Sequence, residues 1–242
     1  MVTRQTPGWL TGWSYAHRGL HNDHVPENSI AGAKGAIDAG LGIECDVQRS
    51  RDGQPMVFHD WELDRLTDRN GLIENYDASE LAQARLSNSD QKPVHLAKFL
   101  DFVDGRVPVL IEIKSRPGYD VENTCGTVAE ILRGRPDMLA VMSFDPKVGE
   151  WFAGNLPECL RGLACTDSLD LGFKGAWREV GALDLASPDF LAIDIRDVPN
   201  TLTTLWREAG RPLLSWTIQT EEWRDKATQY VDAPIAEGAG LE

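Results

Sequence analysis

Residues 42–48 read GIECDVQ, a short strand-like run that carries two acids, Glu44 and Asp46, two positions apart. Successive side chains of a β-strand point to opposite faces, so Glu44 and Asp46 share one face and Cys45 lies on the other. The apolar face suits packing against helices, and the polar face then points inward. Two inward carboxylates are costly unless something compensates their charge, so this stretch predicts a strand that carries a functional site.

Residues 108–114 read PVLIEIK and repeat the pattern. Glu112 and Lys114 share one face, and the valine and the isoleucines form the other. Both runs thus place inward acids near their carboxyl ends. In an α/β barrel, that end of the strands carries the catalytic groups.

Strand-like runs alternate with helix-like segments along the whole chain. The candidate strands are 14–17, 42–48, 55–59, 108–114, 139–143, 161–165, 191–195, 212–218 and 231–235. The candidate helices are 29–39, 96–103, 121–133, 146–155, 168–180, 201–208 and 221–227. This alternation predicts parallel strands joined by crossovers.

We therefore expect a TIM-type (β/α)8 barrel that forms a single domain over residues 8–238, without a large inserted lobe. A doubly wound sheet is less favoured because no glycine-rich phosphate loop follows the first strand. Nine candidate strands compete for eight places, so one is expected to lie outside the barrel. Residues 241–242 are set aside as a candidate vector-derived remnant.

The charge of the chain restricts its partners. It has 38 acidic and 24 basic residues among 242, a net charge of −14. Such a surface repels nucleic-acid phosphates and acidic lipids, so we expect no nucleic-acid partner and no stable membrane association. The four cysteines form no CxxC pair and are interpreted as buried free thiols. The sequence indicates a cytoplasmic monomer or homodimer.

The three inward carboxylates, Glu44, Asp46 and Glu112, are candidate metal ligands. An all-oxygen set suits one hard divalent cation, Mg²⁺ or Ca²⁺. The alternative is that salt bridges to arginine and lysine side chains compensate the charge of these three acids. We favour the metal site because buried ion pairs mark function more often than they supply stability.

Two histidines, His17 and His59, end the first and third candidate strands. Hydrolysis of a phosphodiester needs a base for the nucleophile and an acid for the leaving alkoxide, and imidazoles serve both roles near neutral pH. Arg18 offers a fork of donors for phosphate oxygens, and Lys114 offers a point charge. His21 and His24 are interpreted as solvated loop histidines.

Several short motifs together carry a family resemblance: 16–19 AHRG, 26–29 PENS, 43–47 IECDV, 57–60 VFHD and 111–114 IEIK, with the weaker 142–146 MSFDP and 215–218 SWTI. In this order and spacing, over residues 14 to 236, they resemble the signature of the glycerophosphodiester phosphodiesterases. The resemblance implies a TIM-type barrel and hydrolysis of a small-molecule glycerophosphodiester to an alcohol and glycerol 3-phosphate.

The resemblance also implies roles by position. Its metal ligands would be Glu44, Asp46 and Glu112, its acid–base pair His17 and His59, and its phosphate contacts Arg18 and Lys114. The sequence departs from the family at Cys45, Gln219 and residues 92–96, which leaves the head-group preference open.

Three further residues have two interpretations each. Trp216 and Phe144 either form an apolar wall for the substrate or pack in the core. Glu27 either supports Arg18 or caps the following helix.

Two alternative functions are a related phospholipase on the same barrel, of the phosphoinositide-cleaving or sphingomyelinase D kind, and a non-catalytic binding module. The first would be expected to show an apolar or basic rim, and the second would be expected to lack a ligand or a histidine.

Overall fold

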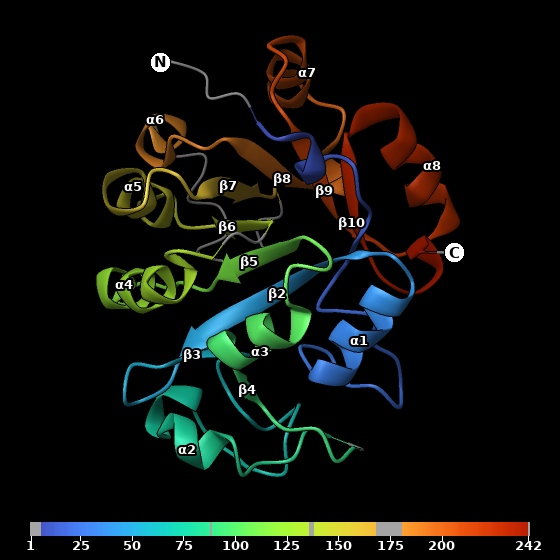
Figure 1. Cartoon of the computed structure of the whole chain (residues 1–242). Helices are drawn as coiled ribbons and strands as arrows, with labels where there is room; N and C mark the ends of the chain where they lie inside the picture. The colour runs from blue at the N-terminus through green and yellow to red at the C-terminus, as the bar shows by residue number, and fades with distance from the viewer. Residues whose placement is uncertain (1–5, 88, 136–137, 168–180, 242) are drawn as a thin grey trace.

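Eight parallel strands close into a barrel in the computed structural model, which describes residues 6–87, 89–135, 138–167 and 181–241 (Figure 1). Strand β1 pairs in parallel with both β2 and β10, which closes the ring. The barrel predicted from the sequence is thus confirmed. In their order around the ring the strands are β1 (Tyr15–Ala16), β2 (Gly42–Arg49), β5 (Val109–Ile113), β6 (Leu139–Ser143), β7 (Leu160–Cys165), β8 (Phe190–Asp194), β9 (Leu213–Ile218) and β10 (Ala233–Ala236).

Helices cover the outside of the barrel between successive strands (Figure 1). The helix α1 begins after Ser29, whose side chain accepts a hydrogen bond from the backbone N–H of Gly32. The predicted helix over 168–180 lies outside the described residues, and the sequence does not predict the short α2 and α6. The helices are α1 (Ile30–Asp38), α2 (Ala78–Leu81), α3 (Leu96–Val103), α4 (Val121–Leu132), α5 (Pro146–Asn155), α6 (Ala182–Ala186), α7 (Thr201–Glu208) and α8 (Glu221–Tyr230).

The candidate strand that lies outside the barrel is β3 (Pro55–Val57). It runs antiparallel to the end of β2, and β4 (Val94–His95) runs antiparallel to β3. Residues 50–54 alone connect β2 to β3, and so short a link can join antiparallel strands but cannot make a parallel crossover. The third candidate strand, which the sequence analysis ends at His59, is therefore not a barrel strand, and His59 follows β3 on a loop.

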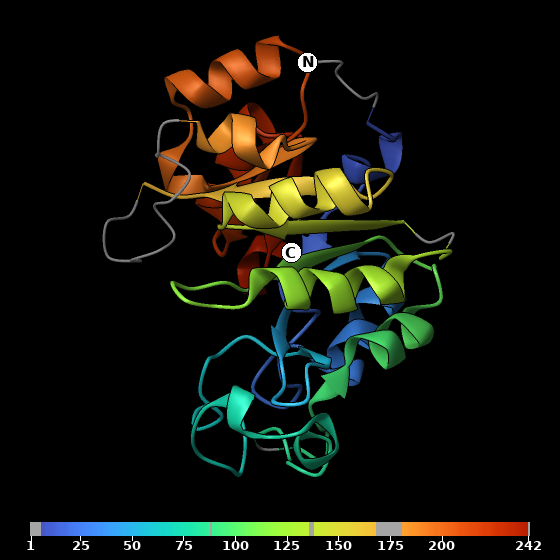
Figure 2. The same ribbon diagram turned by 90° about the vertical axis from the view of Figure 1, so that its left-hand side faces the viewer.

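Residues 58–93 form a compact excursion beside the barrel. It carries α2 and projects from the side of the molecule opposite α7 in both views (Figures 1 and 2). A small apolar cluster holds it together: Met56, Phe58, Leu63, Leu66, Ile73, Leu81 and Leu86. The excursion is short enough to leave the chain a single domain without a large inserted lobe.

Apolar side chains fill the barrel interior beneath the predicted site. Leu110 precedes Glu112 on the same face of β5 and belongs to a buried cluster with Tyr15 and Phe190. A methyl group on Gly42 would lie 2.6 Å from the Tyr15 ring, so this glycine makes room for the aromatic side chain. The cluster closes the barrel from below, and the carboxylates therefore lie in a layer above it, toward the carboxyl ends of the strands.

The outward faces of the strands pack against the helices. Ile43, Cys45 and Ile111 are fully buried in one cluster with residues of α1, α3 and α4, as the alternation of strand side chains predicts. All four cysteines are buried and free. Within the described residues, no helix combines the length and the apolar character that crossing a bilayer requires.

Candidate active site

The three inward carboxylates converge at the carboxyl ends of β2 and β5. Asp46 stands directly opposite Glu112 in the register of the two strands. One oxygen from each of Glu44, Asp46 and Glu112 lies within 4.8 Å of the others. Glu44 and Asp46 are almost completely buried. The structure thus brings the three candidate metal ligands together on one face.

Two cationic side chains compensate this charge. The Lys114 ammonium lies 3.1 Å from Asp46 Oδ1 and 2.8 Å from Glu112 Oε1. The backbone N–H of Arg18 donates to Glu44 Oε2 at 3.0 Å, and Arg18 Nε lies 3.3 Å from Asp46 Oδ2 without the alignment of a hydrogen bond. The salt bridges of the alternative interpretation are therefore present, alongside the carboxylate cluster.

Burial and the neighbouring carboxylates act together on the pKa of Glu44, whereas burial and the neighbouring cations act against each other on the pKa of Asp46. Burial, followed by the charges of Asp46 and Glu112, raises the pKa of Glu44 well above its ordinary value. Burial also disfavours ionisation of Asp46, but the charge of Lys114 and its other cationic neighbours outweighs it and holds the pKa of Asp46 well below the usual range. Two cationic side chains, Lys114 and Arg18, thus face three carboxyls, and Glu44 is the carboxyl whose ionised form is disfavoured.

The cluster fits a hard divalent cation. All of its donor atoms are carboxylate oxygens, the class that Mg²⁺ and Ca²⁺ prefer. The Lys114 ammonium already bridges Asp46 and Glu112 as a cation held by two of the three acids. A divalent ion would also favour the ionised form of Glu44, whose pKa is raised in its absence.

His17 follows β1 and lies at one side of this cluster. Its Nδ1 is 2.6 Å from Glu237 Oε2, and its Nε2 is 4.0 Å from Glu44 Oε2. Burial lowers the pKa of His17, and the hydrogen bond with Glu237 opposes that shift. One ring nitrogen is therefore occupied by a carboxylate, and the other is directed at the candidate metal ligands.

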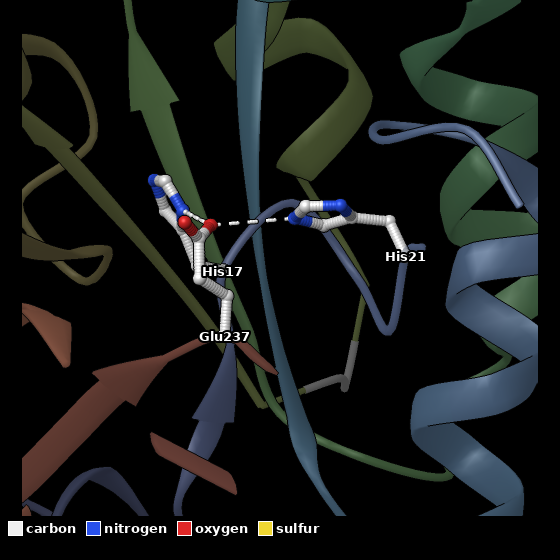
Figure 3. A group of neighbouring side chains, drawn as sticks. All are labelled: His17, His21 and Glu237. Atoms are coloured by element: carbon white, nitrogen blue, oxygen red, sulfur yellow. Dashed lines mark hydrogen bonds and ion pairs between the residues drawn. The ribbon is translucent and has the colours of Figure 1, made fainter. Parts of the chain in front are cut away.

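The sequence interpretation missed Glu237, which comes directly after β10. Its Oε2 contacts His17 and also lies 3.3 Å from His21 Nε2, so the two imidazoles approach one carboxylate (Figure 3). Gln219 donates to Oε1 at 2.6 Å. Despite partial burial, these hydrogen bonds hold the pKa of Glu237 far below its usual value. An acid just past the last strand was the available signal, since barrel sites gather at that end.

The expectation of a solvated loop histidine fits His24, which is exposed, whereas His21 is partly buried and lies 3.3 Å from Glu237. The β1–α1 turn holds His21 in place: its backbone N–H donates to the carbonyl of Gly19 at 3.0 Å, and that of Leu20 donates to Gly32 at 2.9 Å. Gly19 has φ +78°, a conformation that favours glycine.

His59 lies at the other side of the cluster and has its own acidic partner. Its Nδ1 is 2.6 Å from Asp60 Oδ1. Asp60 pairs with Arg65 at 2.6 Å, Arg65 pairs with Glu27 at 3.0 Å, and Glu27 pairs with Arg18 at 2.8 Å. Burial opposes ionisation of Asp60, but the hydrogen bonds with His59 and Arg65 hold its pKa far below the usual range. Asp60 and Arg65 are further contacts that the sequence interpretation missed.

Residues 26–29 connect these groups to the barrel. Ser29 caps α1, and Glu27 instead contacts Arg18, which is one of the two roles foreseen for it. The Asn28 side chain donates to Asp46 Oδ2 at 2.9 Å and accepts from the Asp46 backbone N–H at 3.1 Å. This pair of hydrogen bonds fixes the position of the Asp46 carboxylate.

Two aromatic rings form an apolar side of the site. Phe144 and Trp216 meet edge to face with their ring centroids 5.3 Å apart, and both line a cavity of about 60 Å³ above the carboxylates. That cavity also includes His17 and His59. A wider groove of about 670 Å³ shares His59, Phe144, Glu112 and Lys114 with the cavity and continues past Trp61 and Leu72.

The family comparison matches nearly the whole barrel. Residues 17–236 match the model described as the glycerophosphoryl diester phosphodiesterase family. Curated relatives include proteins named glycerophosphodiester phosphodiesterase from Bacillus altitudinis, 40% identical over 31% of this chain, and from Caldanaerobacter subterraneus, 36% identical over 40% of it. The matching stretches cover 31% and 37% of those two proteins, about a third of their length.

Solved structures match over a larger share. A phosphodiesterase from Oleispira antarctica, solved in complex with its product sn-glycerol-3-phosphate, has a TM-score of 0.80 and 26% identity, covering 93% of this chain and 92% of that one. A glycerophosphodiester phosphodiesterase from Thermotoga maritima has a TM-score of 0.75 and 23% identity, covering 95% of both chains. The second likeness concerns the fold alone.

Proposed function

Because the chain belongs to the glycerophosphoryl diester phosphodiesterase family, we propose that it hydrolyses glycerophosphodiesters to an alcohol and glycerol 3-phosphate. One observation carries the proposal: His17 and His59 lie at two sides of the carboxylate cluster, each 2.6 Å from a carboxylate through Nδ1. The product bound by the Oleispira antarctica phosphodiesterase supports this choice of substrate.

The histidines act as an acid–base pair in this proposal. A carboxylate on Nδ1 selects the tautomer of the ring and leaves Nε2 to exchange a proton with the substrate. One imidazole accepts the proton of the attacking hydroxyl, and the other donates a proton to the leaving alkoxide. Glu237 and Asp60 are then positioning residues, because each acts through its histidine.

The carboxylates of Glu44, Asp46 and Glu112 would hold one divalent cation, Mg²⁺ or Ca²⁺. When bound, such an ion supplies positive charge that stabilises charge developing on the phosphoryl oxygens. Arg18 and Lys114 are proposed to contact the phosphate. Both side chains line the small cavity beside the carboxylates, so their positive charges lie where a phosphate group would bind.

Phe144 and Trp216 are proposed to contact the carbon atoms of the glycerol moiety. Their rings line the small cavity that contains both histidines, and an apolar wall beside a few polar groups is typical of small-molecule sites. The wider groove past Trp61 gives the leaving alcohol a path away from the carboxylates.

The test is release of glycerol 3-phosphate from glycerophosphocholine and glycerophosphoethanolamine, with Mg²⁺ or Ca²⁺ added to metal-free protein. We expect His17→Ala and His59→Ala each to lower kcat by at least about 100-fold, the scale of general acid–base catalysis. His24→Ala removes an exposed histidine of the same loop as His17 and serves as the matched control. Full activity in either active-site variant, or no release with either cation, would refute the proposal.

A further inference from the structure

We propose that His17, His21 and Glu237 form a second cation site, separate from the carboxylate cluster, that binds Zn²⁺ and thereby inhibits the enzyme. The binding part of this inference stands on the geometry of the three side chains. Only the inhibition rests on the proposed function, because it requires that His17 take part in catalysis.

The three side chains present their donor atoms to one point. His17 Nδ1 and His21 Nε2 lie 2.6 Å and 3.3 Å from the same oxygen, Glu237 Oε2, and all three donor atoms lie within 4.8 Å of one another. Figure 3 shows the two rings, both from the connection between β1 and α1, directed at the carboxylate of Glu237. Tetrahedral zinc with bonds of about 2.0–2.1 Å separates neighbouring ligand atoms by about 3.3 Å. The His21 contact already has this spacing, and the His17 contact needs to lengthen by about 0.7 Å.

The two sites offer different donor atoms and therefore favour different cations. Two imidazole nitrogens and one carboxylate are a ligand set of zinc sites that keep an open fourth position. Mg²⁺ and Ca²⁺ prefer the all-oxygen cluster of Glu44, Asp46 and Glu112. The side chains of His17, His21 and Glu237 keep 16%, 24% and 24% of their surface exposed, so an ion from solvent can reach them and water can fill the remaining position.

The fold holds these donors in place before any ion binds. The backbone N–H of His17 donates to Ala236 at 2.8 Å, which joins the end of β1 to the segment that carries Glu237. Gln219 donates to Glu237 Oε1 and so leaves Oε2 directed at the histidines. The backbone N–H of Glu237 donates to Ile218 at 3.0 Å. The three side chains therefore lose little conformational entropy when an ion binds.

Occupation of this site would remove the acid–base function of His17. His17 can accept a proton at Nε2 only while its Nδ1 keeps a proton of its own, and the hydrogen bond to Glu237 holds that proton on Nδ1. With Zn²⁺ on Nδ1, the single ring proton resides on Nε2, and that nitrogen no longer accepts another near neutral pH. Ligand atoms must be deprotonated, so zinc and protons compete for the same nitrogens.

The binding test uses Co²⁺ as a spectroscopic probe in the metal-free protein, residues 1–242. We expect one Co²⁺ with the visible absorption of a nitrogen-ligated ion, displaced stoichiometrically by Zn²⁺. His21→Ala should weaken this binding by at least 10-fold. His24→Ala, which changes an exposed histidine three residues further on, should leave it unchanged, and so should Glu112→Gln in the carboxylate cluster. Equal Co²⁺ affinity in the wild type and in His21→Ala would overturn the site.

The inhibition test follows turnover with saturating Mg²⁺ while Zn²⁺ is added, each variant being compared with its own rate without zinc. We expect His21→Ala to need at least 10-fold more Zn²⁺ for half-inhibition, and extra Mg²⁺ not to relieve inhibition of the wild type. Relief by Mg²⁺ together with loss of Co²⁺ binding in Glu112→Gln would instead place zinc at the carboxylates and overturn the proposal. A protein with no phosphodiesterase activity would refute the proposed function, and the Co²⁺ titration would still decide the site.

Discussion

Replacing Glu237 by glutamine tests the role of the acid that directly follows the last barrel strand. The change keeps the size and the hydrogen-bonding capacity of the side chain but removes its charge. In the protein, Glu237 Oε2 is 2.6 Å from His17 Nδ1, and this contact opposes the lowering of the His17 pKa by burial. An amide can turn its NH₂ group toward Nδ1, which places the ring proton on Nε2, the wrong tautomer for a base.

The size of the effect follows from the charged hydrogen bond that is lost. Hydrogen bonds to charged groups contribute about 1.5–3 kcal/mol. At about 1.36 kcal/mol per tenfold in rate, loss of this bond from the transition state lowers kcat roughly 10- to 150-fold. KM should change less than about threefold, because Glu237 acts through His17 and does not contact the proposed substrate.

The assay measures glycerol 3-phosphate release from glycerophosphocholine in zinc-free buffer with saturating Mg²⁺, giving kcat and KM separately. Glu208→Gln, an exposed glutamate on α7, is the matched control for the same chemical change. A Glu237→Gln enzyme within about threefold of wild-type kcat, or one whose defect lies entirely in KM, would show that the carboxylate does not position His17.

Three further predictions concern metal, backbone and pH. Chelation should abolish turnover and Mg²⁺ or Ca²⁺ should restore it, with Glu112→Gln needing at least about 10-fold more cation, as read from activity against metal concentration; undiminished activity in chelator would contradict the metal site. Gly19→Ala should lose about 1–3 kcal/mol in urea unfolding, because the residue has φ +78° and its new methyl group would lie 2.9 Å from the Gly32 carbonyl carbon; an unchanged midpoint would disprove the constraint. Burial raises the pKa of the Cys125 thiol from 9.0 to about 12, so folding stability should fall as pH rises through that window, where the unfolded thiol ionises and the folded one does not. Urea unfolding of Cys125→Ala from pH 9 to 11 should show a slope shallower by about 1.4 kcal/mol per pH unit, and parallel slopes would refute the assignment.

The barrel and its carboxylate face could be predicted because both depend on short-range geometry. Side chains of a strand alternate with a period of two, so the order of Glu44, Cys45 and Asp46 already separates an inward acid pair from an outward thiol. The convergence of Glu112 with this pair follows once β2 and β5 are parallel neighbours. These inferences need no knowledge of how the loops fold.

The position of His59 shows where that reasoning stops. Its strand resembles the barrel strands in composition, yet β3 pairs antiparallel with β2, since residues 50–54 cannot span a crossover. The length of the connection carried this information, and the residue pattern did not. His59 nevertheless reaches the site because the excursion folds back and Asp60, Arg65 and Glu27 connect it to Arg18.

The sequence by itself determined the strand faces, the acids that they carry and the family to which the motifs belong. Only the tertiary structure decided the partners of the histidines. Glu237 is separated from His17 by 220 residues and becomes its neighbour only when β10 pairs with β1 and the ring closes. Periodicity arises from the covalent geometry of each strand, whereas a contact across the closure depends on the packing of every strand between.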